Sequence, residues 1–365
     1  MELKFENKLT EKQILEKAKA FGKLDTNALD TNLFIFGDNF EGMAKLYNTF
    51  GPCVDLVYID PPFNTNQTFS VSEGRCSSIS RAKNGLIAYS DQLTKAEFLE
   101  FLRERIILIK NLLTDKGSLY LHIDCKIGHY VKILLDEIFG EENYRNDITR
   151  IKSNPKNFNR KAYGNEKDVI YFYCKNAKNQ IWNEIKIKAT DEELEKLFPK
   201  VDENGRRYTT IPLHAPGETN GVTGSEWRGM LPPEGRHWRT DPAVFDEMDR
   251  NGLIEWSKNG NPRIKKFADE HQGKKIQDIW EFKDPQYPRY PTEKNLDMLL
   301  RIIDESSLDD SIVMDCFAGS GPTLWAAHIR NRKWIGMDAS KIALKTITKR
   351  KDEIGDFTLI ENEGE

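Results

Sequence analysis

The string Asp60-Pro61-Pro62-Phe63 places an acid, two prolines and an aromatic residue directly after the apolar run 54–59. Two consecutive prolines fix φ and remove two backbone donors, so the carboxylate and the neighbouring carbonyls form a rigid edge rich in acceptors. Such an edge suits an exocyclic amino group, which has two hydrogens to donate, and Phe63 supplies a flat face on which a base could stack. We therefore predict that these four residues act on the amino group of a base. An ordinary proline-rich turn is the alternative.

A second string, Asp315-Cys316-Phe317-Ala318-Gly319-Ser320-Gly321, follows the apolar run 311–314 and precedes a helix expected to begin at Pro322-Thr323. Glycines let the backbone approach a ligand closely, and a helix N-terminus favours electron-rich groups. Asp338 follows the next apolar run and lies 23 residues after Asp315. A carboxylate at that spacing can accept hydrogen bonds from ribose hydroxyls, so the pattern indicates a nucleoside cofactor. A purely structural turn is the alternative.

The elements that position these residues alternate along the chain. Hydrophobic patterning predicts helices over 95–113 and 129–139 and strands over 118–123 and 168–174. Together with the strands before Asp60, Asp315 and Asp338, this order predicts an α/β fold with a doubly wound, mostly parallel sheet. The acids then lie at the carboxyl ends of strands, where such folds bind ligands.

Two stretches break the alternation. Residues 64–92 are rich in Asn and Ser, which predicts a mobile loop over a site or, alternatively, a surface loop without function. Residues 176–289 carry many turn signals and scattered tryptophans, which predicts a smaller inserted domain of irregular structure. The domain prediction is therefore 1–175 and 290–365 for the two parts of the main domain, with 176–289 inserted. The acidic residues from Asp352 onward predict a solvated tail.

The composition excludes several classes of protein. The 365-residue chain is 31% charged and 10% aromatic, which indicates a folded rather than a disordered protein. It has no apolar run long enough to cross a membrane and no signal-peptide pattern at its start, so we expect a cytoplasmic protein. Its five cysteines include no CxxC pair, which fits a reducing compartment and excludes an ordinary zinc site. His122 and His129 flank Asp124, but packing explains them better than ligation, and we expect no metal.

Positive charge is concentrated in one region. The chain as a whole has a net charge of -4, yet residues 145–188 hold 11 Lys and Arg against 4 Asp and Glu. A basic segment on an acidic body is compatible with steering toward a polyanion. The stretch 150–161 interleaves basic residues with Asn and Phe158, which fits phosphate contact or, equally, a solvated face.

These motifs resemble the S-adenosylmethionine-dependent amino DNA methyltransferases, specifically the β-ordered class of adenine-N6 enzymes. In that class a DPP(Y/F) catalytic motif comes first, target recognition follows and an FxGxG cofactor motif comes last. Residues 60–63 match the first motif and 317–321 the last. Residues 290–294 look like the family's helix-start segment at the methionine end of the cofactor, and 36–39 look like another recurrent element. Residues 227–229 and 235–239 resemble elements of middle domains in this class, including those of modification subunits of type III restriction systems.

The resemblance implies a Rossmann-like methyltransferase fold with an inserted target-recognition domain, and methyl transfer from S-adenosylmethionine to N6 of an adenine flipped out of double-stranded DNA. The implied catalytic residues are Asp60, Pro61, Pro62 and Phe63. The implied cofactor-binding residues are Asp38, Thr292, Lys294, Asp315, Phe317, Ala318, Gly319, Ser320, Gly321, Thr323 and Asp338. The expected DNA-binding residues are Lys152, Lys156, Arg160, Lys161, Arg228, Arg236, Trp238 and Arg239. A homodimer and a cognate restriction endonuclease subunit are the partners that the resemblance leaves open.

Three residues depart from the family's pattern: Cys316 stands in place of Pro, Pro322 in place of Thr and Asn295 in place of Pro. Because none of these changes removes a charge or a glycine, we expect cofactor binding to survive. Three other readings remain for experiment. They are a nicotinamide-dependent oxidoreductase, which would leave residues 60–63 unexplained, a DNA-binding subunit that has lost catalysis, and a methyltransferase acting on RNA or on a protein glutamine.

Overall fold

The computed structural model describes residues 2–62, 94–154, 161–284 and 294–362, together with the backbone of three short strands between 69 and 89. The chain forms two compact units, one of Met1–Ile185 with Gln277–Glu365 and one of Lys186–Ile276. The second unit lies inside the region 176–289 that the sequence marks as inserted, while residues 176–185 and 277–284 belong to the first unit.

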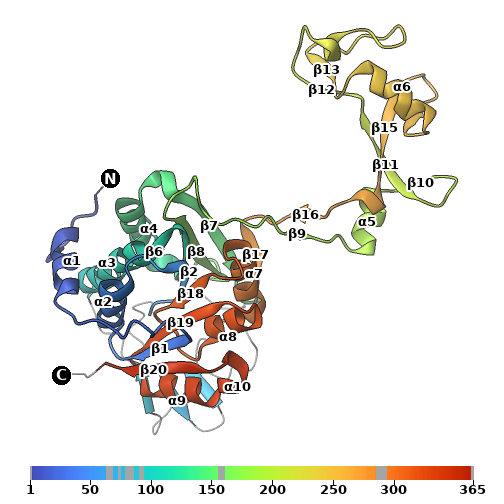
Figure 1. Ribbon diagram of the computed structural model, residues 1–365. Helices are drawn as coiled ribbons and strands as arrows, with labels where there is room; N and C mark the ends of the chain where they lie inside the picture. Colours follow the sequence, from blue (N-terminus) through green and yellow to red (C-terminus); the bar gives the residue numbers. More distant parts are fainter. Residues whose placement is uncertain are drawn as a thin grey trace. The chain divides into compact units, whose positions relative to one another are not determined.

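The first unit is built on one mostly parallel sheet (Figure 1). In spatial order its strands are β17 (Ile279–Glu281), β7 (Tyr144–Ile151), β8 (Lys167–Cys174), β6 (Leu113–Ile123), β2 (Val54–Ile59), β18 (Ile312–Asp315), β19 (Lys333–Asp338), β1 (Asn32–Phe36) and β20 (Phe357–Glu361). All neighbours pair in parallel except β8, which is antiparallel to both β6 and β7. Strands from the two ends of the chain thus meet at the β2–β18 pair, which is the point where a doubly wound sheet binds its ligands.

Helices cover the sheet in two groups whose members contact one another (Figure 1). One group is α1 (Glu11–Lys19), α2 (Asn39–Phe50), α3 (Lys95–Leu112) and α4 (Cys125–Phe139), and the other is α7 (Leu296–Ser306), α8 (Pro322–Ile329), α9 (Lys341–Lys349) and α10 (Lys351–Ile354). A 3₁₀ turn, η1 (Glu141–Asn143), follows α4. The predicted α/β architecture, with a doubly wound and mostly parallel sheet, is confirmed.

Side-chain caps fix where the helices begin. Thr94 forms a capping box with Glu97, so α3 begins at Lys95, where the hydrophobic pattern predicts the start of this helix. α4 begins at Cys125 rather than at the predicted His129 because the Asp124 carboxylate accepts the backbone N–H of Lys126. Asp124 is therefore a helix cap in the structure.

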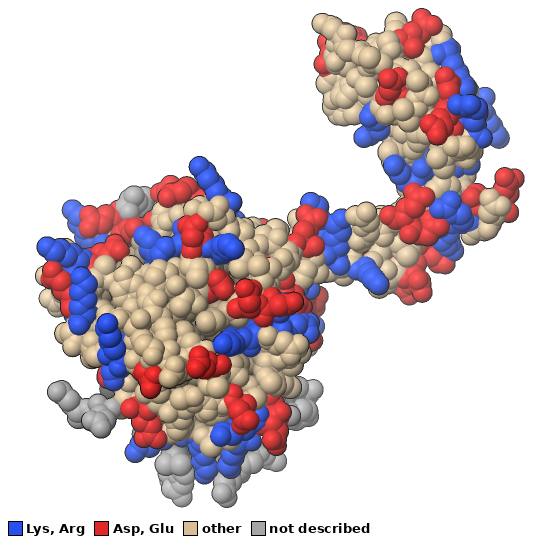
Figure 2. Space-filling model, in the orientation of Figure 1, with Lys and Arg blue, Asp and Glu red and all other residues tan. Residues whose placement is uncertain are grey.

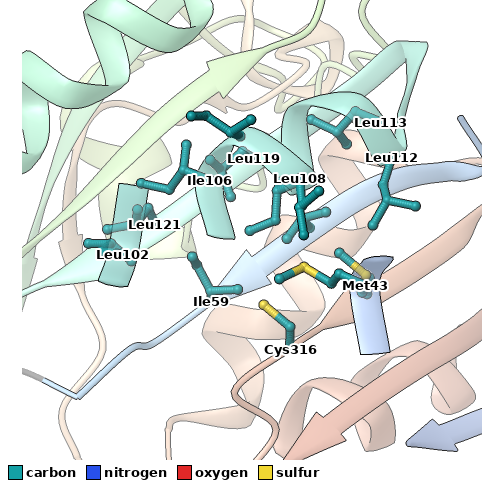
Figure 3. Close-up of a cluster of buried hydrophobic side chains, with 14 of the residues drawn as sticks. Met43, Ile59, Leu102, Ile106, Leu108, Leu112, Leu113, Leu119, Leu121 and Cys316 are labelled. Carbon is teal, nitrogen blue, oxygen red and sulfur yellow. The ribbon is translucent and has the colours of Figure 1, made fainter. Parts of the chain in front are cut away.

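The core of the first unit reaches directly under the ends of β2 and β18. Figure 3 shows Ile59 and Cys316 within the cluster that includes Leu102, Leu121 and Met43. Both side chains are fully buried. Because Ile59 precedes Asp60 and Cys316 follows Asp315, close packing of their neighbours in the core restrains both acids.

The second unit has a small core of its own. A four-stranded sheet contains β10 (Lys200–Val201), β11 (Arg207–Pro212), β15 (Pro262–Phe267) and β14 (Ile254–Trp256), and two pairs add β12 (His214–Pro216) with β13 (Arg236–Trp238) and β9 (Lys186–Ile187) with β16 (Lys274–Lys275). The helical segments are α5 (Asp191–Leu197), η2 (Val222–Gly224), α6 (Pro242–Arg250) and η3 (Ala268–Glu270). Trp227, Trp238 and Phe245 pack edge to face at its centre. The unit is thus more regular than its turn signals suggested.

Two smaller predictions are wrong. The region 64–92, expected to be a loop, contains an antiparallel sheet of β3 (Phe69–Ser72), β4 (Arg75–Ser78) and β5 (Leu86–Tyr89). The acidic tail is also structured, because β20 pairs with β1 over residues 357–361 and forms an edge of the main sheet. Phe357, Leu359 and Ile360 give this segment apolar residues that favour a strand and that its acids obscured. Among the described residues no helix is long and apolar enough to span a membrane.

Candidate active site

Asp60 follows the last residue of β2, next to the carboxyl end of β18. The register pairs Val57 with Met314, so Asp315 lies beside Tyr58 and Asp60 extends beyond it. The Asp60 side chain is 18% exposed, and its Oδ2 atom lies 2.8 Å from Lys294 Nζ. Its Oδ1 atom is buried and has no hydrogen-bond partner. Pro61 is buried and Pro62 half-buried, while Phe63 lies outside the described residues.

Asp315 begins the glycine loop between β18 and α8. It is almost fully buried, and its Oδ1 accepts the backbone N–H of Phe317 at 3.0 Å. Burial raises the pKa of Asp315 to about 7 against the opposing hydrogen bonds, and the nearby Asp60 and Asp338 charges raise it further. This carboxyl group is therefore close enough to the other two acids for their charges to affect its protonation.

The loop itself has the backbone of a close-approach site. Gly319 and Gly321 both have positive φ, 53° and 79°, and a Cβ on Gly321 would come within 2.4 Å of Ile347 Cδ1. Ser320 is buried with an unpartnered Oγ, and its carbonyl accepts from Arg350 Nη1 at 2.7 Å. Ala318 and Thr323 are also buried. The loop thus holds an unsatisfied polar atom in a space that excludes larger side chains.

Asp338 ends β19 and holds the loop in place. Its Oδ2 accepts the Gly319 N–H at 2.8 Å and its Oδ1 accepts the Ser340 N–H at 2.8 Å. Burial raises the pKa of Asp338 against these two bonds. A carboxylate has about four acceptor positions, so both oxygens can still accept from ribose hydroxyls.

Asp38 has a structural role that its sequence context did not show. It caps α2 by accepting the N–H groups of Phe40 and Glu41, and its Oδ2 lies 2.9 Å from Arg105 Nη2. Arg105 Nε donates to Asn39 Oδ1, whose own amide donates to the Cys316 carbonyl at 2.7 Å. Asp38 is thereby tied to the loop before Phe317. Sequence reasoning missed Arg105 and noted Asn39 only as part of the recurrent element 36–39.

Lys294 lies at the catalytic end of the site. Its side chain is 8% exposed and forms the ion pair with Asp60, whereas the sequence placed it with the cofactor. Thr292 lies outside the described residues. The ion pair shows that the Lys294 side chain reaches Asp60 at the end of β2.

The departures from the expected pattern have structural explanations. Cys316 is fully buried in the core, where burial raises the pKa of its thiol well above the usual range. Pro322 occupies the first turn of α8, where a missing N–H costs nothing, and Asn295 caps α7 by accepting the Met298 N–H at 3.2 Å. None of the three disturbs the loop.

The expected DNA-binding residues separate into distinct groups. Lys152 pairs with Asp168 at 2.5 Å, Arg228 bridges Asp246 and Asp249, and Trp238 is buried with its Nε1 donating to Ser225 O. Lys161 is exposed, while Lys156 and Arg160 lie outside the described residues. Pairing and burial make Lys152, Arg228 and Trp238 poor candidates for nucleic-acid contact, which the residue types alone could not show.

Arg236 and Arg239 are exposed on the second unit, and two residues that sequence reasoning missed accompany them. The cluster of His214, Arg236, Arg239 and Arg263, here called the basic cluster, spans β12, β13, β15 and the residue after β13. Burial lowers the pKa of His214, and the three arginine charges lower it further, which places them near its imidazole. Arg239 Nε donates to Pro212 O and Arg263 Nη2 to Thr210 O. No carboxylate of the described residues lies within ion-pair distance of these arginines.

Charges elsewhere are mixed. On the visible face of the first unit Lys and Arg are interspersed with Asp and Glu (Figure 2). Among the described residues no three His, Cys, Asp or Glu side chains are arranged to hold a metal ion.

A doubly wound sheet whose neighbouring strands β2, β18 and β19 each end at an acid, with a glycine loop after β18, is typical of proteins that bind nucleoside cofactors. The DNA methylase profile of the N6/N4 methyltransferase family matches residues 54–349. The chain is 40% identical to the type II methyltransferase M.EcaI of Enterobacter cloacae over 362 residues, covering 95% of this chain and 77% of that protein.

A more distant relative is the StyLTI Mod subunit, from a type III restriction-modification enzyme of Salmonella typhimurium. It is 24% identical over 345 residues, which cover 85% of this chain and 52% of that protein. Among solved structures, the M1.HpyAVI complex with SAM has a TM-score of 0.45 and 17% identity, covering 87% of this chain and 98% of that one. The chain belongs to the S-adenosylmethionine-dependent N6/N4 family of DNA methylases.

The residues present fit this cofactor. The buried, unpartnered Ser320 Oγ offers a hydrogen-bonding group, and the positive φ of Gly319 and Gly321 gives the loop a backbone that residues with side chains rarely adopt. Asp338 would hold the ribose, and the loop from Phe317 to Gly321 would surround the rest. Membership of this family excludes the oxidoreductase reading.

Proposed function

We propose that the protein is a site-specific DNA methyltransferase that acts on the exocyclic N6 of adenine. The observation that carries this proposal is the buried Oδ1 atom of Asp60, an acceptor without a partner at the carboxyl end of β2 beside the cofactor loop. An amino group of either adenine or cytosine could donate to it. The resemblance of residues 60–63 to the adenine-N6 motif favours adenine.

The chemistry follows from the acceptors at this edge. The amino nitrogen of adenine is a poor nucleophile because its lone pair is delocalised into the ring. When Asp60 Oδ1 and the Pro61 carbonyl accept its two hydrogens, they favour a pyramidal nitrogen with an available lone pair. Bound S-adenosylmethionine supplies an activated methyl group. Transfer is then direct, without a covalent enzyme intermediate, and burial raises the pKa of Cys53 to about 12, which leaves its thiol unreactive.

The second unit is the target-recognition region in this proposal. Arg236, Arg239, Arg263 and His214 present donors to a polyanion without competition from nearby carboxylates, and Lys161 adds a positive charge on the first unit. The target adenine must leave the duplex to reach Asp60. Phe63 and the segment 64–92 remain our candidates for holding it outside.

The relatives suggest the biological setting. Names such as type II methyltransferase and type III Mod subunit support a role in restriction-modification. We propose double-stranded DNA in the cytoplasm as the substrate, with a second copy of this chain or a restriction subunit as partners to be sought.

The test is transfer of labelled methyl from S-adenosylmethionine to unmethylated genomic DNA, followed by nucleoside analysis. We expect N6-methyladenine as the product. Asp60→Ala should abolish transfer while cofactor affinity stays within about 2-fold, because Asp60 contacts the amino group and not the cofactor. Asp297→Ala, which removes an exposed carboxylate at the start of α7, is the control and should retain full activity.

Other products would refute the proposal in identifiable ways. N4-methylcytosine would show that the site accepts the cytosine amino group. Label in RNA or protein but not in DNA would move the substrate to another class, and cofactor binding without any transfer would indicate a subunit that has lost catalysis. Undiminished transfer by Asp60→Ala would exclude the assigned mechanism.

A further inference from the structure

A buried polar network lies behind Asp60 and has no role in the chemistry described so far. The β2–β6 register pairs Ile59 with Leu121, which brings His122 opposite Asp60. His122 is fully buried. Its Nδ1 lies 2.9 Å from Tyr58 Oη and 4.0 Å from Asp60 Oδ1, and its Nε2 lies 3.3 Å from Asp168 Oδ2. The imidazole therefore separates the catalytic carboxylate from a second, structural one.

Asp168 is an ionised acceptor in this network. Lys152 Nζ lies 2.5 Å from its Oδ1 and Arg150 Nη1 lies 3.8 Å from its Oδ2. Burial would raise the pKa of Asp168, but the hydrogen bonds from His122 and Lys152 and the positive charge of Lys152 outweigh it and hold that pKa well below the usual range. An ionised carboxylate cannot donate, so the His122 Nε2 atom must carry the hydrogen that joins them.

Arg150 fixes the far side of Asp168. Its guanidinium is fully buried, with Nη2 2.5 Å from Asp284 Oδ1 and Nε donating to the Phe282 carbonyl at 2.8 Å. The carboxylate that orients His122 is thus held by β7 and by the residues after β17. Such outer contacts set which nitrogen of a histidine is protonated.

The remaining contacts determine the state of the His122 Nδ1 atom. Burial lowers the pKa of His122, and the Lys294 charge lowers it further, against the raising effects of Asp168 and Asp60. The imidazole is therefore neutral near pH 7, and Nδ1 is an acceptor. Burial and the Asp60 charge raise the pKa of Tyr58 well above its usual value, so its hydroxyl stays protonated and donates to Nδ1.

This arrangement explains why Asp60 Oδ1 has no partner. The Tyr58 hydrogen is directed to His122, and His122 presents a lone pair rather than an N–H toward that side. A buried acceptor left without a donor is unfavourable, and a substrate amino group removes this penalty when it binds. The opposite tautomer, or the imidazolium, would place an N–H on Nδ1 beside Asp60 Oδ1 and compete with the substrate.

We propose that His122 is a positioning residue for methyl transfer, and that Asp168 fixes its tautomer so that Asp60 Oδ1 stays open to the hydrogen of the substrate amino group. The geometry of this inference comes from the hydrogen bonds of His122 described above. Its effect on methyl transfer rests on the proposed function. His122 acts only through Asp60 and Tyr58.

The first test is Asp168→Asn, which can donate to His122 Nε2 and thereby allow the tautomer with hydrogen on Nδ1. We expect kcat to fall about 10²-fold while cofactor affinity stays within about 2-fold. The reason is that an N–H on His122 Nδ1 would then compete with the substrate amino group for Asp60 Oδ1. Long-range ¹H–¹⁵N correlation spectra of ¹⁵N-histidine-labelled protein should show hydrogen on Nε2 in the wild type and on Nδ1 in the variant. A wild-type spectrum with hydrogen on Nδ1 would overturn the inference, as would unchanged turnover by Asp168→Asn.

A matched pair of hydroxyl deletions separates positioning from a loss of packing. Tyr58→Phe removes the donor to His122 Nδ1, whereas Tyr120→Phe, on the neighbouring position of β6, removes a buried hydroxyl bonded to Ser306 Oγ at 2.8 Å. Without the Tyr58 hydroxyl, a proton on Nδ1 gains Asp60 Oδ1 as its acceptor, so the pKa of His122 rises.

The pH–rate profile reports this change. Protonated His122 is the inactive form, so Tyr58→Phe should lose activity on acidification at a higher pH than the wild type and Tyr120→Phe do. The charged groups that face His122 are Asp60, Asp168 and Lys294, with Lys152, Arg150 and Asp315 beyond them. Identical profiles for the three proteins would overturn the inference. A wild type that makes no N6-methyladenine would refute the proposed function and not this inference. The tautomer is measured without substrate, and the ratio of variant to wild-type rates can be measured with any methyl acceptor.

Discussion

The catalytic end of the first unit and the basic cluster of the second hold their charged groups in opposite ways. At the catalytic end Asp60, His122 and Asp168 are largely buried. The pairing of the neighbouring strands β2, β6 and β8 holds them close together. In the basic cluster Arg236 and Arg239 are exposed and lack carboxylate partners among the described residues. Chemistry needs fixed geometry in a low-dielectric setting, while recognition of a polyanion needs free donors.

The largest effect expected from this comparison concerns Asp338, whose two carboxylate oxygens both accept backbone N–H groups. Asp338→Ala removes the acceptor of the Gly319 and Ser340 N–H groups together with the proposed ribose contact, so the dissociation constant for S-adenosylmethionine should rise about 10²-fold. Isothermal titration calorimetry measures it. Asp310→Ala, an exposed acid before β18, is the control, and DNA affinity should hardly change in either variant. Equal cofactor affinity in all three proteins would remove Asp338 from the site.

The second prediction concerns the basic cluster. The double variant Arg236→Gln/Arg239→Gln should weaken binding to duplex DNA about 10-fold and lower the slope of log affinity against log salt by up to about 2, since each phosphate contact contributes about 1. Fluorescence anisotropy over a range of salt concentrations measures both quantities. Arg206→Gln is the control, because Arg206 lies on the same unit and is partly exposed but is paired with Asp269 and Glu270. A larger loss in the control would place DNA contact elsewhere.

The third prediction compares Glu305, a buried carboxyl group outside the proposed catalytic end, with Asp60. Burial raises the pKa of Glu305 to about 7, against the lowering effect of Arg301. Because the native pKa exceeds the unfolded one, the native state loses stability as pH rises from about 4.5 to about 7. Glu305→Gln should therefore gain about 1–3 kcal/mol in free energy of unfolding near pH 8 and little near pH 4.5.

Urea denaturation at the two pH values measures this gain. Methyl transfer by Glu305→Gln should stay unchanged, in contrast to Asp60→Ala. A stability change independent of pH would show that Glu305 is ionised in the native state as in the unfolded one.

The fold and the position of the glycine loop could be predicted from local sequence. Apolar runs ending at Asp60, Asp315 and Asp338 identified three parallel strands, and the glycines marked the loop after β18. Boundaries were less predictable: the start of α4 depends on the Asp124 cap, and β20 was hidden by its acidic residues. Strand pairing stabilises β20 through partners in β1 that no local pattern reveals.

The roles of individual charged residues could not be predicted in the same way. Lys152 and Lys294 looked like phosphate and cofactor ligands, yet they pair with Asp168 and Asp60. Arg228 and Arg236 are both exposed arginines in the sequence-marked insertion, and only their neighbours in space distinguish a paired side chain from one with free donors.

The sequence by itself determined which residues can do chemistry and the order of the elements that carry them, because periodicity, glycines and prolines act over a few neighbouring positions. Only the tertiary structure decided which charges meet, since His122 reaches Asp60 and Asp168 through the pairing of strands far apart in the chain. Hydrogen-bond partnership and burial are properties of that pairing, and they decide whether an ionisable group is open to a substrate or already occupied.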